Sequence, residues 1–186
     1  MTGLDPETDE ILEIHCLITS PTLAILDHDG FSAVVHVGEA RLAAMSKWCI
    51  DTHTRSGLVQ EVLDSTVTHG EAASGLLAYI KRFAPEPRTA LLAGNTVHAD
   101  KGFLSKGPYR AVVEHLHYRI LDVSSIKEAA RRWCPGGAES EVVRGVPRKM
   151  GQHRARGDIL ESIKEAKYYM ENIFKPATGD GGYGTE

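Results

Sequence analysis

The chain has 186 residues, of which 42% are hydrophobic and 25% are charged, a balance that fits one globular domain with a sizeable core. Its formal net charge of -4 argues against binding to long nucleic acid through charge alone, because such binding needs a basic face that neutralises many phosphates. No stretch approaches the roughly 18 apolar residues of a transmembrane helix, so we expect no membrane association.

The cysteines and the start of the chain bear on its compartment. Cys16, Cys49 and Cys134 form no CxxC pair, and their odd number suits a reducing environment. Neither a signal peptide nor an Arg-rich presequence leads the chain. We therefore expect an intracellular protein.

The first third of the chain predicts strands joined by short turns. Residues 11–18 alternate apolar side chains at the two-residue period of a strand. A shorter strand is expected at 22–26, and residues 31–37 are rich in the β-branched types that strands favour. Three strands with short connections predict an antiparallel meander.

The period then becomes helical, with helices expected at 39–50 and 57–63 and the clearest amphipathic helix at 70–83. Short buried strands are expected at 90–93 and 120–123, each followed by a helical pattern, as βα units require. A last long helix is expected at about 158–174. The expected fold class is α/β, with a mixed sheet: an antiparallel meander, as in α+β folds, followed by βα units.

Three side chains are of chemical interest. Asp100 lies in segment 94–104, Asp158 opens the last predicted helix, and His153 lies five residues before it. Taken singly, each Asp would be an exposed helix cap or first-turn acid, and His153 a surface histidine. Phosphodiester hydrolysis by two metal ions, however, needs several carboxylates and a base for the attacking water. These residues would supply parts of such a site, although two carboxylates alone make a poor cage for two Mg²⁺ ions.

Five ordered segments at consistent spacing match one known family. They are residues 1–14, 48–59, 94–100, 117–124 and 153–163. On these segments the chain resembles the oligoribonucleases over nearly its whole length, from about Met1 to Lys175. The resemblance implies a ribonuclease H-like exonuclease domain over residues 1–175, and residues 176–186 are expected to form a disordered tail.

The resemblance also implies an activity. It predicts a homodimeric 3′→5′ exoribonuclease that degrades oligoribonucleotides of a few residues, above all dinucleotides, using Mg²⁺ or Mn²⁺. Asp100 and Asp158 match the family's third and fourth acidic metal ligands, and His153 matches the general base that activates water. Members of the family occur in mitochondria and in the cytosol, so both a mitochondrial and a cytoplasmic location are expected.

Further residues match the family's substrate site. Leu4 matches a leucine that wedges between the two bases, and Trp48 and Tyr118 match aromatic residues that line the site, Tyr118 reaching it from the partner subunit. Without the resemblance, these three would be read as core or interface residues. The polar set that caps the 5′ phosphate is matched by His53, Thr96 (where the family usually has Ser), Arg119 and Ser124.

Such a cap explains a preference for short substrates. Arg119 can grip a terminal phosphate through a bidentate, charge-assisted contact, and a closed pocket leaves no exit for a longer 5′ strand. Aromatic residues add stacking of roughly 1–3 kcal/mol per base with little sequence preference. An acidic protein can therefore bind RNA through a pocket rather than a basic surface.

The chain departs from the family at its start. The family's first motif, an Asp-x-Glu pair at the end of a strand, would lie upstream of Met1. We therefore expect this chain to lack the first, central strand and two of the four acidic ligands, to bind metal weakly, and to be poorly folded or inactive as it stands. Glu7, Asp5 and Glu10 match loop positions and are not expected to replace those ligands.

Two other functions remain open. A non-catalytic protein that binds short oligonucleotides would keep the phosphate cap and the base wedge without metal, but it would not need His153 or Asp158. A proofreading-type DNA exonuclease would share the acidic residues, but the residues Trp48, His53 and Arg119 favour the short-RNA family.

Overall fold

The computed structural model describes residues 1–148 and 154–174 of the chain. After an N-terminal strand pair, helices predominate and the two later strands are short. In chain order they are β1 (Glu13–Cys16), β2 (Phe31–Val34), α1 (Glu39–Ala43), α2 (Lys47–Arg55), α3 (Leu58–Asp64), α4 (His69–Phe83), β3 (Leu92–Gly94), α5 (Val97–Leu104), a 3-10 turn (Gly107–Tyr109), α6 (Arg110–His115), β4 (Ile120–Asp122), α7 (Val123–Trp133), a 3-10 turn (Gly137–Glu139), α8 (Glu141–Arg144), α9 (Ala155–Tyr169) and a π-helical turn (Met170–Phe174).

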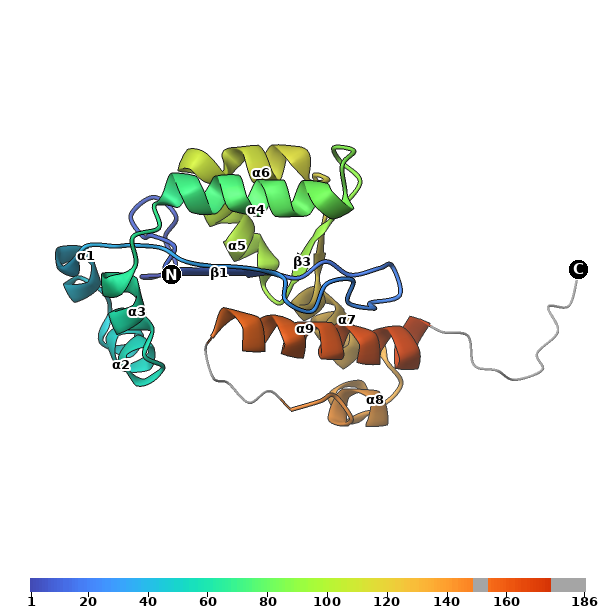
Figure 1. The fold of residues 1–186 in the computed structure, drawn as a ribbon. Coiled ribbons are helices and arrows are strands. Elements are labelled where there is room, and N and C mark those ends of the chain that lie inside the picture. Colours follow the sequence, from blue (N-terminus) through green and yellow to red (C-terminus); the bar gives the residue numbers. More distant parts are fainter. Residues whose placement is uncertain (149–153, 175–186) are drawn as a thin grey trace, which may run out of the picture.

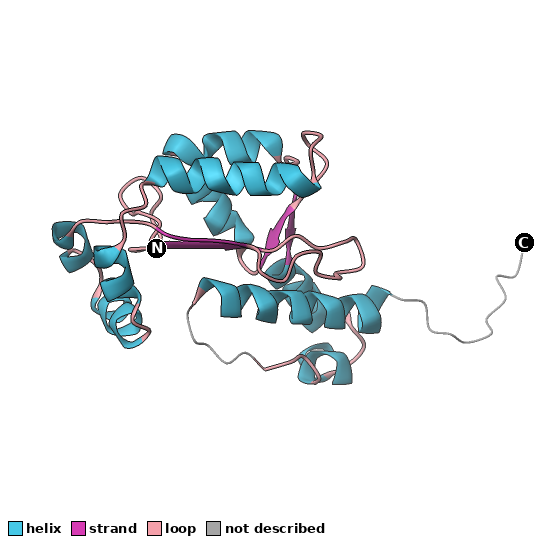
Figure 2. Ribbon diagram, viewed as in Figure 1, coloured by secondary structure: helices cyan, strands magenta, loops and turns pink. Residues whose placement is uncertain are grey.

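The strands lie between two groups of helices (Figures 1 and 2). Helices α4 and α6 lie side by side on one side of the strands, and α7, α8 and α9 gather on the other. Helices α1, α2 and α3 form a third group beyond the start of β1, close to the N-terminus. The layers place the β3–β4 pair in contact with α5, α7 and α9.

The strands form two separate pairs in the described part of the chain. β1 runs antiparallel to β2, with Glu13 opposite Val34, and β3 runs parallel to β4, with Leu92 opposite Ile120. A three-stranded antiparallel meander followed by βα units was expected. The mixed α/β fold is confirmed, but the meander is reduced to the β1–β2 pair. The strand expected at 22–26 is wrong. That segment makes only a single bridge, because Leu23 takes up a left-handed conformation that turns the chain.

Local signals explain most helix boundaries. The helix expected at 39–50 is divided, because the Ser46 side chain accepts the N–H of Cys49 and caps a new helix, α2. Helix α4 starts with a reciprocal capping box between Thr68 and Glu71, and its apolar stripe is buried as the periodicity predicted. The last helix begins at Ala155, earlier than expected.

Three apolar clusters hold the layers together. The largest packs the inner face of α4 against α6 and the chain around β1 and β2, with Leu76, Ile80 and Val112 almost completely buried. A second joins α1, α2 and α3 to Leu12. The third joins α7 to α9 through Val123 and Tyr169.

Leu12 connects the second cluster to the strands, and its side chain is 0% exposed. We expect Leu12→Ala to lower the free energy of unfolding by about 2–5 kcal/mol, because it leaves a cavity that the surrounding helices fill only in part. Urea denaturation measures the change. Leu26→Ala is the matched control. Leu26 is 53% exposed, so its truncation should change stability by less than about 0.5 kcal/mol.

Candidate active site

Two helices begin at the edge where the parallel strands end. β3 leads into α5 through Asn95 and Thr96, and β4 leads directly into α7. Because the carboxyl ends of parallel strands meet at one edge, two of the expected cap residues come together there. The hydroxyl oxygens of Thr96 and Ser124 are 3.2 Å apart, and the Thr96 N–H donates to Ser124 Oγ at 3.0 Å.

Asp122, which sequence reasoning did not single out, holds these two turns in place. Its Oδ1 accepts the N–H of Thr96 at 3.0 Å and the N–H of Ser124 at 2.9 Å. Burial raises its pKa, but the hydrogen bonds from His98 and from the backbone N–H groups of Ser124 and Thr96 prevail and hold the pKa of Asp122 below its ordinary value. An ionised Asp122 therefore fixes the two hydroxyl-bearing turns against each other.

Behind this pair lies a buried carboxylate from α9. Glu165 is only 1% exposed and accepts a hydrogen bond from Asn95 Nδ2 at 3.0 Å and from the Tyr169 hydroxyl at 3.2 Å. Asn95 Nδ2 also lies 3.3 Å from Ser124 Oγ. Glu165 was not predicted from the sequence. Its position next to Ala166, a member of the apolar stripe of α9, was the one signal that it could be buried.

Thr96 has an unusual backbone. Its φ of 55° places it in the left-handed region, where a β-branched residue is a genuine outlier. The N–H of Thr96 is shared between Asp122 and Ser124, which gives the strained turn two hydrogen bonds. Strain of about 1–3 kcal/mol that is held in this way is characteristic of functional sites.

Asp100 lies in the first turn of α5 and Asp158 in the first turn of α9, both exposed at the surface. Protein atoms around the carboxyl group of Asp100 raise its pKa by desolvation, and the nearby Asp122 adds to the shift. His153, expected as the general base, lies outside the described residues.

Asp100 and Asp158 are the carboxylates that this chain would offer a metal ion. Among residues 1–148 and 154–174, however, no three His, Cys, Asp or Glu side chains gather closely enough to hold one. The described donor set therefore falls short of the several carboxylates that a two-ion site needs, and it fits divalent metal only in part.

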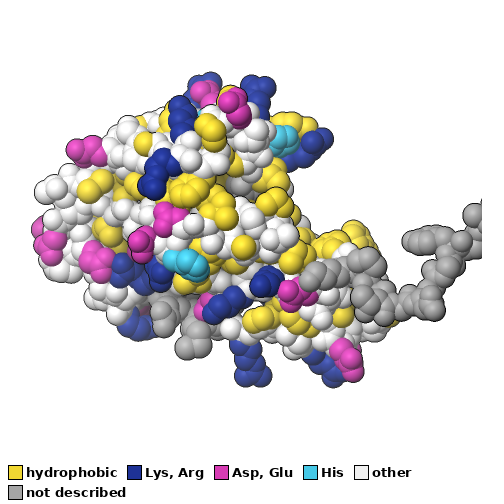
Figure 3. Space-filling model, turned by 45° about the vertical axis from the view of Figure 1, so that its right-hand side comes forward, with side chains coloured by type: hydrophobic (Ala, Val, Ile, Leu, Met, Phe, Trp, Pro, Cys, Tyr) yellow, Lys and Arg dark blue, Asp and Glu magenta, His cyan; other side chains and the backbone are white. Residues whose placement is uncertain are grey.

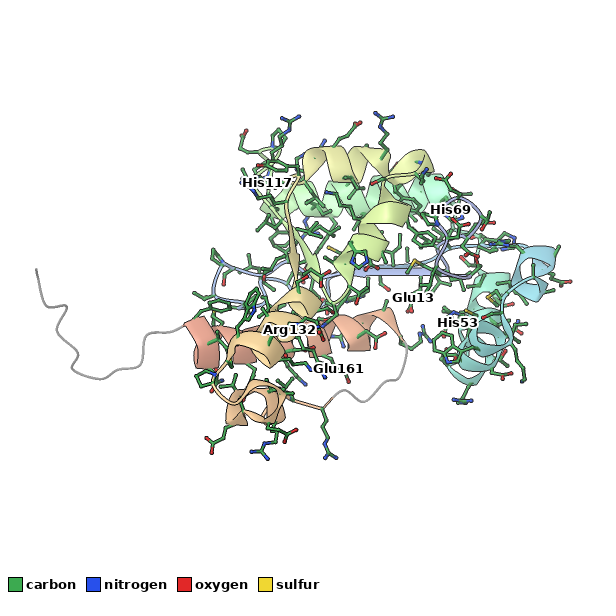
Figure 4. All side chains as sticks on the ribbon, turned by 180° about the vertical axis from the view of Figure 1, so that it is seen from behind. Glu13, His53, His69, His117, Arg132 and Glu161 are labelled. Atoms are coloured by element: carbon green, nitrogen blue, oxygen red, sulfur yellow. The ribbon has the colours of Figure 1, made fainter. Side chains whose placement is uncertain are left out.

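Helix α2 carries two of the expected substrate residues on different faces. Trp48 is 61% exposed, whereas His53 is buried and its Nε2 lies 3.1 Å from the carbonyl oxygen of Met1. Figure 4 shows His53 on this helix, beside the end of β1 that carries Glu13. Leu4 is 80% exposed in the loop that precedes β1. Exposure of this kind leaves Leu4 and Trp48 accessible to a ligand.

Tyr118 and Arg119 lie at the opposite end of β4 from Ser124, since they precede that strand and Ser124 follows it. The Arg119 guanidinium stacks on the Tyr118 ring, with 4.8 Å between its carbon and the ring centre, and Tyr118 is 64% exposed. Figure 4 shows the neighbouring His117 far from His53. The fold therefore separates Arg119 from the other expected cap residues within one chain.

An ion-pair cluster that the sequence analysis missed joins three elements beside the site. The Arg154 guanidinium donates to both carboxylate oxygens of Glu13, with a shortest distance of 3.0 Å, and to both oxygens of Glu61 at 2.7 and 2.8 Å. It also reaches the carbonyl oxygen of Ser56 at 3.2 Å. Glu61, followed by Glu13, raises the pKa of Arg154 above its ordinary value. We call Arg154, Glu13 and Glu61 the arginine clamp.

One face of the surface carries side chains of both charges. Basic and acidic side chains alternate over the face in Figure 3, without a continuous basic patch there. Within the described ranges, no helix has both the length and the apolar character needed to cross a bilayer.

Comparisons with known proteins identify the family of this chain. A family model described as "Exonuclease" matches residues 1–166. The chain is 45% identical to the mouse protein "Oligoribonuclease, mitochondrial" over 97% of this chain and 73% of the mouse protein. It is 44% identical to "Oligoribonuclease" of Nocardia farcinica over 96% of this chain and 80% of that protein, and 45% identical to the human mitochondrial oligoribonuclease over 94% and 70%. The chain therefore belongs to the oligoribonuclease family, and its domain is that of a 3′→5′ exoribonuclease.

Proposed function

We propose that this protein degrades very short oligoribonucleotides, above all dinucleotides, to mononucleotides, and that Thr96 and Ser124 cap the substrate's 5′ phosphate. The pair of hydroxyls 3.2 Å apart, at the start of two helices and one turn away from Asp100, carries the proposal. Helix starts present N–H groups and positive dipole ends, both of which favour a phosphate. Relatives named oligoribonucleases support the substrate class.

The roles of the reacting groups follow from their chemistry. Divalent ions, Mg²⁺ or Mn²⁺, when bound, activate a water molecule and neutralise charge on the phosphate. Asp100 and Asp158 would each supply ligand oxygens, and His153 would accept the proton of the attacking water. Leu4 and Trp48, both exposed, would wedge and stack the bases.

Two carboxylates hold divalent metal weakly, so we propose that this chain turns substrate over poorly. The absence of a group of three or more ligating side chains among the described residues supports this. Capture of a short oligonucleotide through the cap and the base contacts does not depend on those ligands.

We also propose that the working form is a homodimer. Tyr118 and Arg119 precede β4, whereas Ser124 follows it, so one chain cannot easily bring Arg119 and Ser124 to the same phosphate. A second copy can present its Tyr118 and Arg119 to the cap of the first. The exposed side chain of Tyr118 is accessible to such a contact with a second copy.

The compartment is proposed from the relatives. The mouse and human proteins carry "mitochondrial" in their names, and the Nocardia protein, from a bacterium, does not. We propose a mitochondrial or cytoplasmic location for this chain.

Hydrolysis of a 5′-labelled diribonucleotide tests the activity. With Mn²⁺, the protein should slowly release labelled mononucleotide, and EDTA should abolish the reaction. Binding of the dinucleotide without metal-dependent cleavage, even at high enzyme concentration, would favour the non-catalytic binding protein instead. A deoxydinucleotide that competes as well as the ribonucleotide would favour a DNA exonuclease.

A further inference from the structure

Glu165, Asn95, Ser124 and Thr96 form a continuous chain of hydrogen bonds that runs from the core to the surface. It starts at a carboxylate that is 1% exposed and ends at the exposed Thr96. The outer end of this hydrogen-bond series is the neutral hydroxyl of Thr96. The direction of its hydrogen therefore decides whether that hydroxyl offers an anion a donor or an acceptor.

The inner end fixes the direction of the Asn95 amide. A carboxylate only accepts hydrogen bonds, so the side-chain atom of Asn95 that faces Glu165 at 3.0 Å must be the NH₂ group. The Tyr169 hydroxyl cannot replace it, because it donates to the other oxygen of Glu165, at 3.2 Å. Burial and the neighbouring Glu165 raise the pKa of Tyr169, which keeps its proton in place.

This orientation leaves the side-chain oxygen of Asn95 unsatisfied within the described part of the chain. Its Oδ1 is buried and has no hydrogen-bond partner among the described residues. A flipped amide would place the oxygen beside Ser124 Oγ, where a hydroxyl could donate to it. The amide therefore keeps its contact with Glu165 although its buried oxygen remains without a hydrogen-bond partner in residues 1–148 and 154–174.

The Asn95 orientation then sets the direction of the two hydroxyls. Ser124 Oγ has two acceptor sites, and it receives Asn95 Nδ2 at 3.3 Å and the Thr96 N–H at 3.0 Å. With both acceptor sites in use, its hydrogen is directed to Thr96 Oγ1, 3.2 Å away. Thr96 Oγ1 then accepts from Ser124, and its own hydrogen points away from the network, toward solvent or a ligand.

We infer that Glu165 is a positioning residue that acts through Asn95 and Ser124 to make the Thr96 hydroxyl a hydrogen-bond donor to the substrate's 5′ phosphate. The inference rests on the proposed role of Thr96 and Ser124 as the phosphate cap. It assigns a task to a carboxylate of α9 that does not itself touch the substrate. It also explains why a negative side chain lies behind an anion site: an acceptor at the inner end produces a donor at the outer end.

Binding of two probes in EDTA tests this, because it needs no turnover. The probes are a diribonucleotide with a 5′ phosphate and the same dinucleotide with a 5′ hydroxyl, and the readout is the ratio of their dissociation constants. We expect Glu165→Gln to lower the wild-type preference for the phosphate about tenfold, since a charge-assisted hydrogen bond is lost. Thr96→Val should lower it by a similar factor, and the double variant should show no further loss.

Tyr169→Phe is the matched control. It removes the other hydrogen bond to Glu165 and leaves the contact with Asn95, so the phosphate preference should stay at the wild-type value. If thermal melting shows that Glu165→Gln does not fold, Asn95→Ala interrupts the same chain one step later and should give the same loss.

The possible failures are distinguishable. If Thr96→Val lowers the preference while folded Glu165→Gln or Asn95→Ala keeps it, the cap exists and the inference about Glu165 is wrong. Independent, additive losses in the double variant would equally contradict it. If the wild type itself does not prefer the 5′ phosphate, the proposed cap fails, and the inference fails with it.

Discussion

An extension of this chain by an N-terminal strand that ends in Asp-x-Glu should raise its Mn²⁺-dependent hydrolysis of a diribonucleotide by roughly 100-fold or more. The described residues offer Asp100 and Asp158 but gather no group of three ligating side chains. Two added carboxylates would complete the number that a two-ion site requires. The separate strand pairs, β1–β2 and β3–β4, also offer edges that an added strand can join.

A second extension carries Asn-x-Gln in place of Asp-x-Glu. It separates the effect of strand pairing from the effect of metal binding by the two added carboxylates. It should stabilise the fold to the same extent as the first extension, but leave hydrolysis near the level of the unextended chain. The prediction would be contradicted if both extensions activated the enzyme equally, or if the unextended chain cleaved as fast as the extended one. Isothermal titration with Mn²⁺ gives an independent measure of the added ligands.

Loss of the arginine clamp should lower the stability of the fold. Arg154→Ala leaves the Glu13 side chain, only 10% exposed, without its cationic partner, and removes the contacts to Glu61 and Ser56. Breaking a buried pair costs about 3–5 kcal/mol and an exposed one about 1 kcal/mol or less. The clamp is intermediate in exposure, so we expect a loss of about 2–3 kcal/mol in the free energy of unfolding.

The clamp also bears on catalysis, because it anchors Arg154, which follows His153 in the sequence and is the N-cap residue of α9, the helix that carries Asp158 in its first turn. In the extended enzyme, Arg154→Ala should therefore lower kcat more than it raises KM. Arg132→Ala is the control: Arg132 is 62% exposed and pairs with Glu128 within α7, far from these residues in the sequence. An equal loss of kcat in both variants would show that the clamp has no special role.

Periodicity predicted the helices well, and turn geometry limited the prediction of strands. The apolar stripe of α4 and its Thr68–Glu71 box are local, so the sequence alone locates that helix. The expected strand at 22–26 failed, because the conformation of Leu23 depends on its surroundings and carries no local signature. Ser46 could have been recognised as a helix start, since Ser is a preferred N-cap residue.

The site was predictable to the extent that single residues carry recognisable chemistry. Thr96 and Ser124 were expected together and are in contact. Their supports, Asp122, Asn95 and Glu165, were not predicted. Each is an ordinary polar residue in the sequence, and its role arises only where β3, β4 and α9 meet. The arginine clamp was missed for the same reason, because Glu13 and Arg154 are separated by 141 positions.

The left-handed backbone at Thr96 implies a trade-off between thermal stability and activity at that position. Glycine adopts φ near 55° without steric penalty, so Thr96→Gly would relieve part of the strain, although its greater freedom in the unfolded chain offsets some of the gain. It would also delete the hydroxyl that ends the hydrogen-bond chain. Directed evolution for thermal stability alone would therefore favour glycine at position 96. Directed evolution for hydrolysis of short RNA would eliminate it.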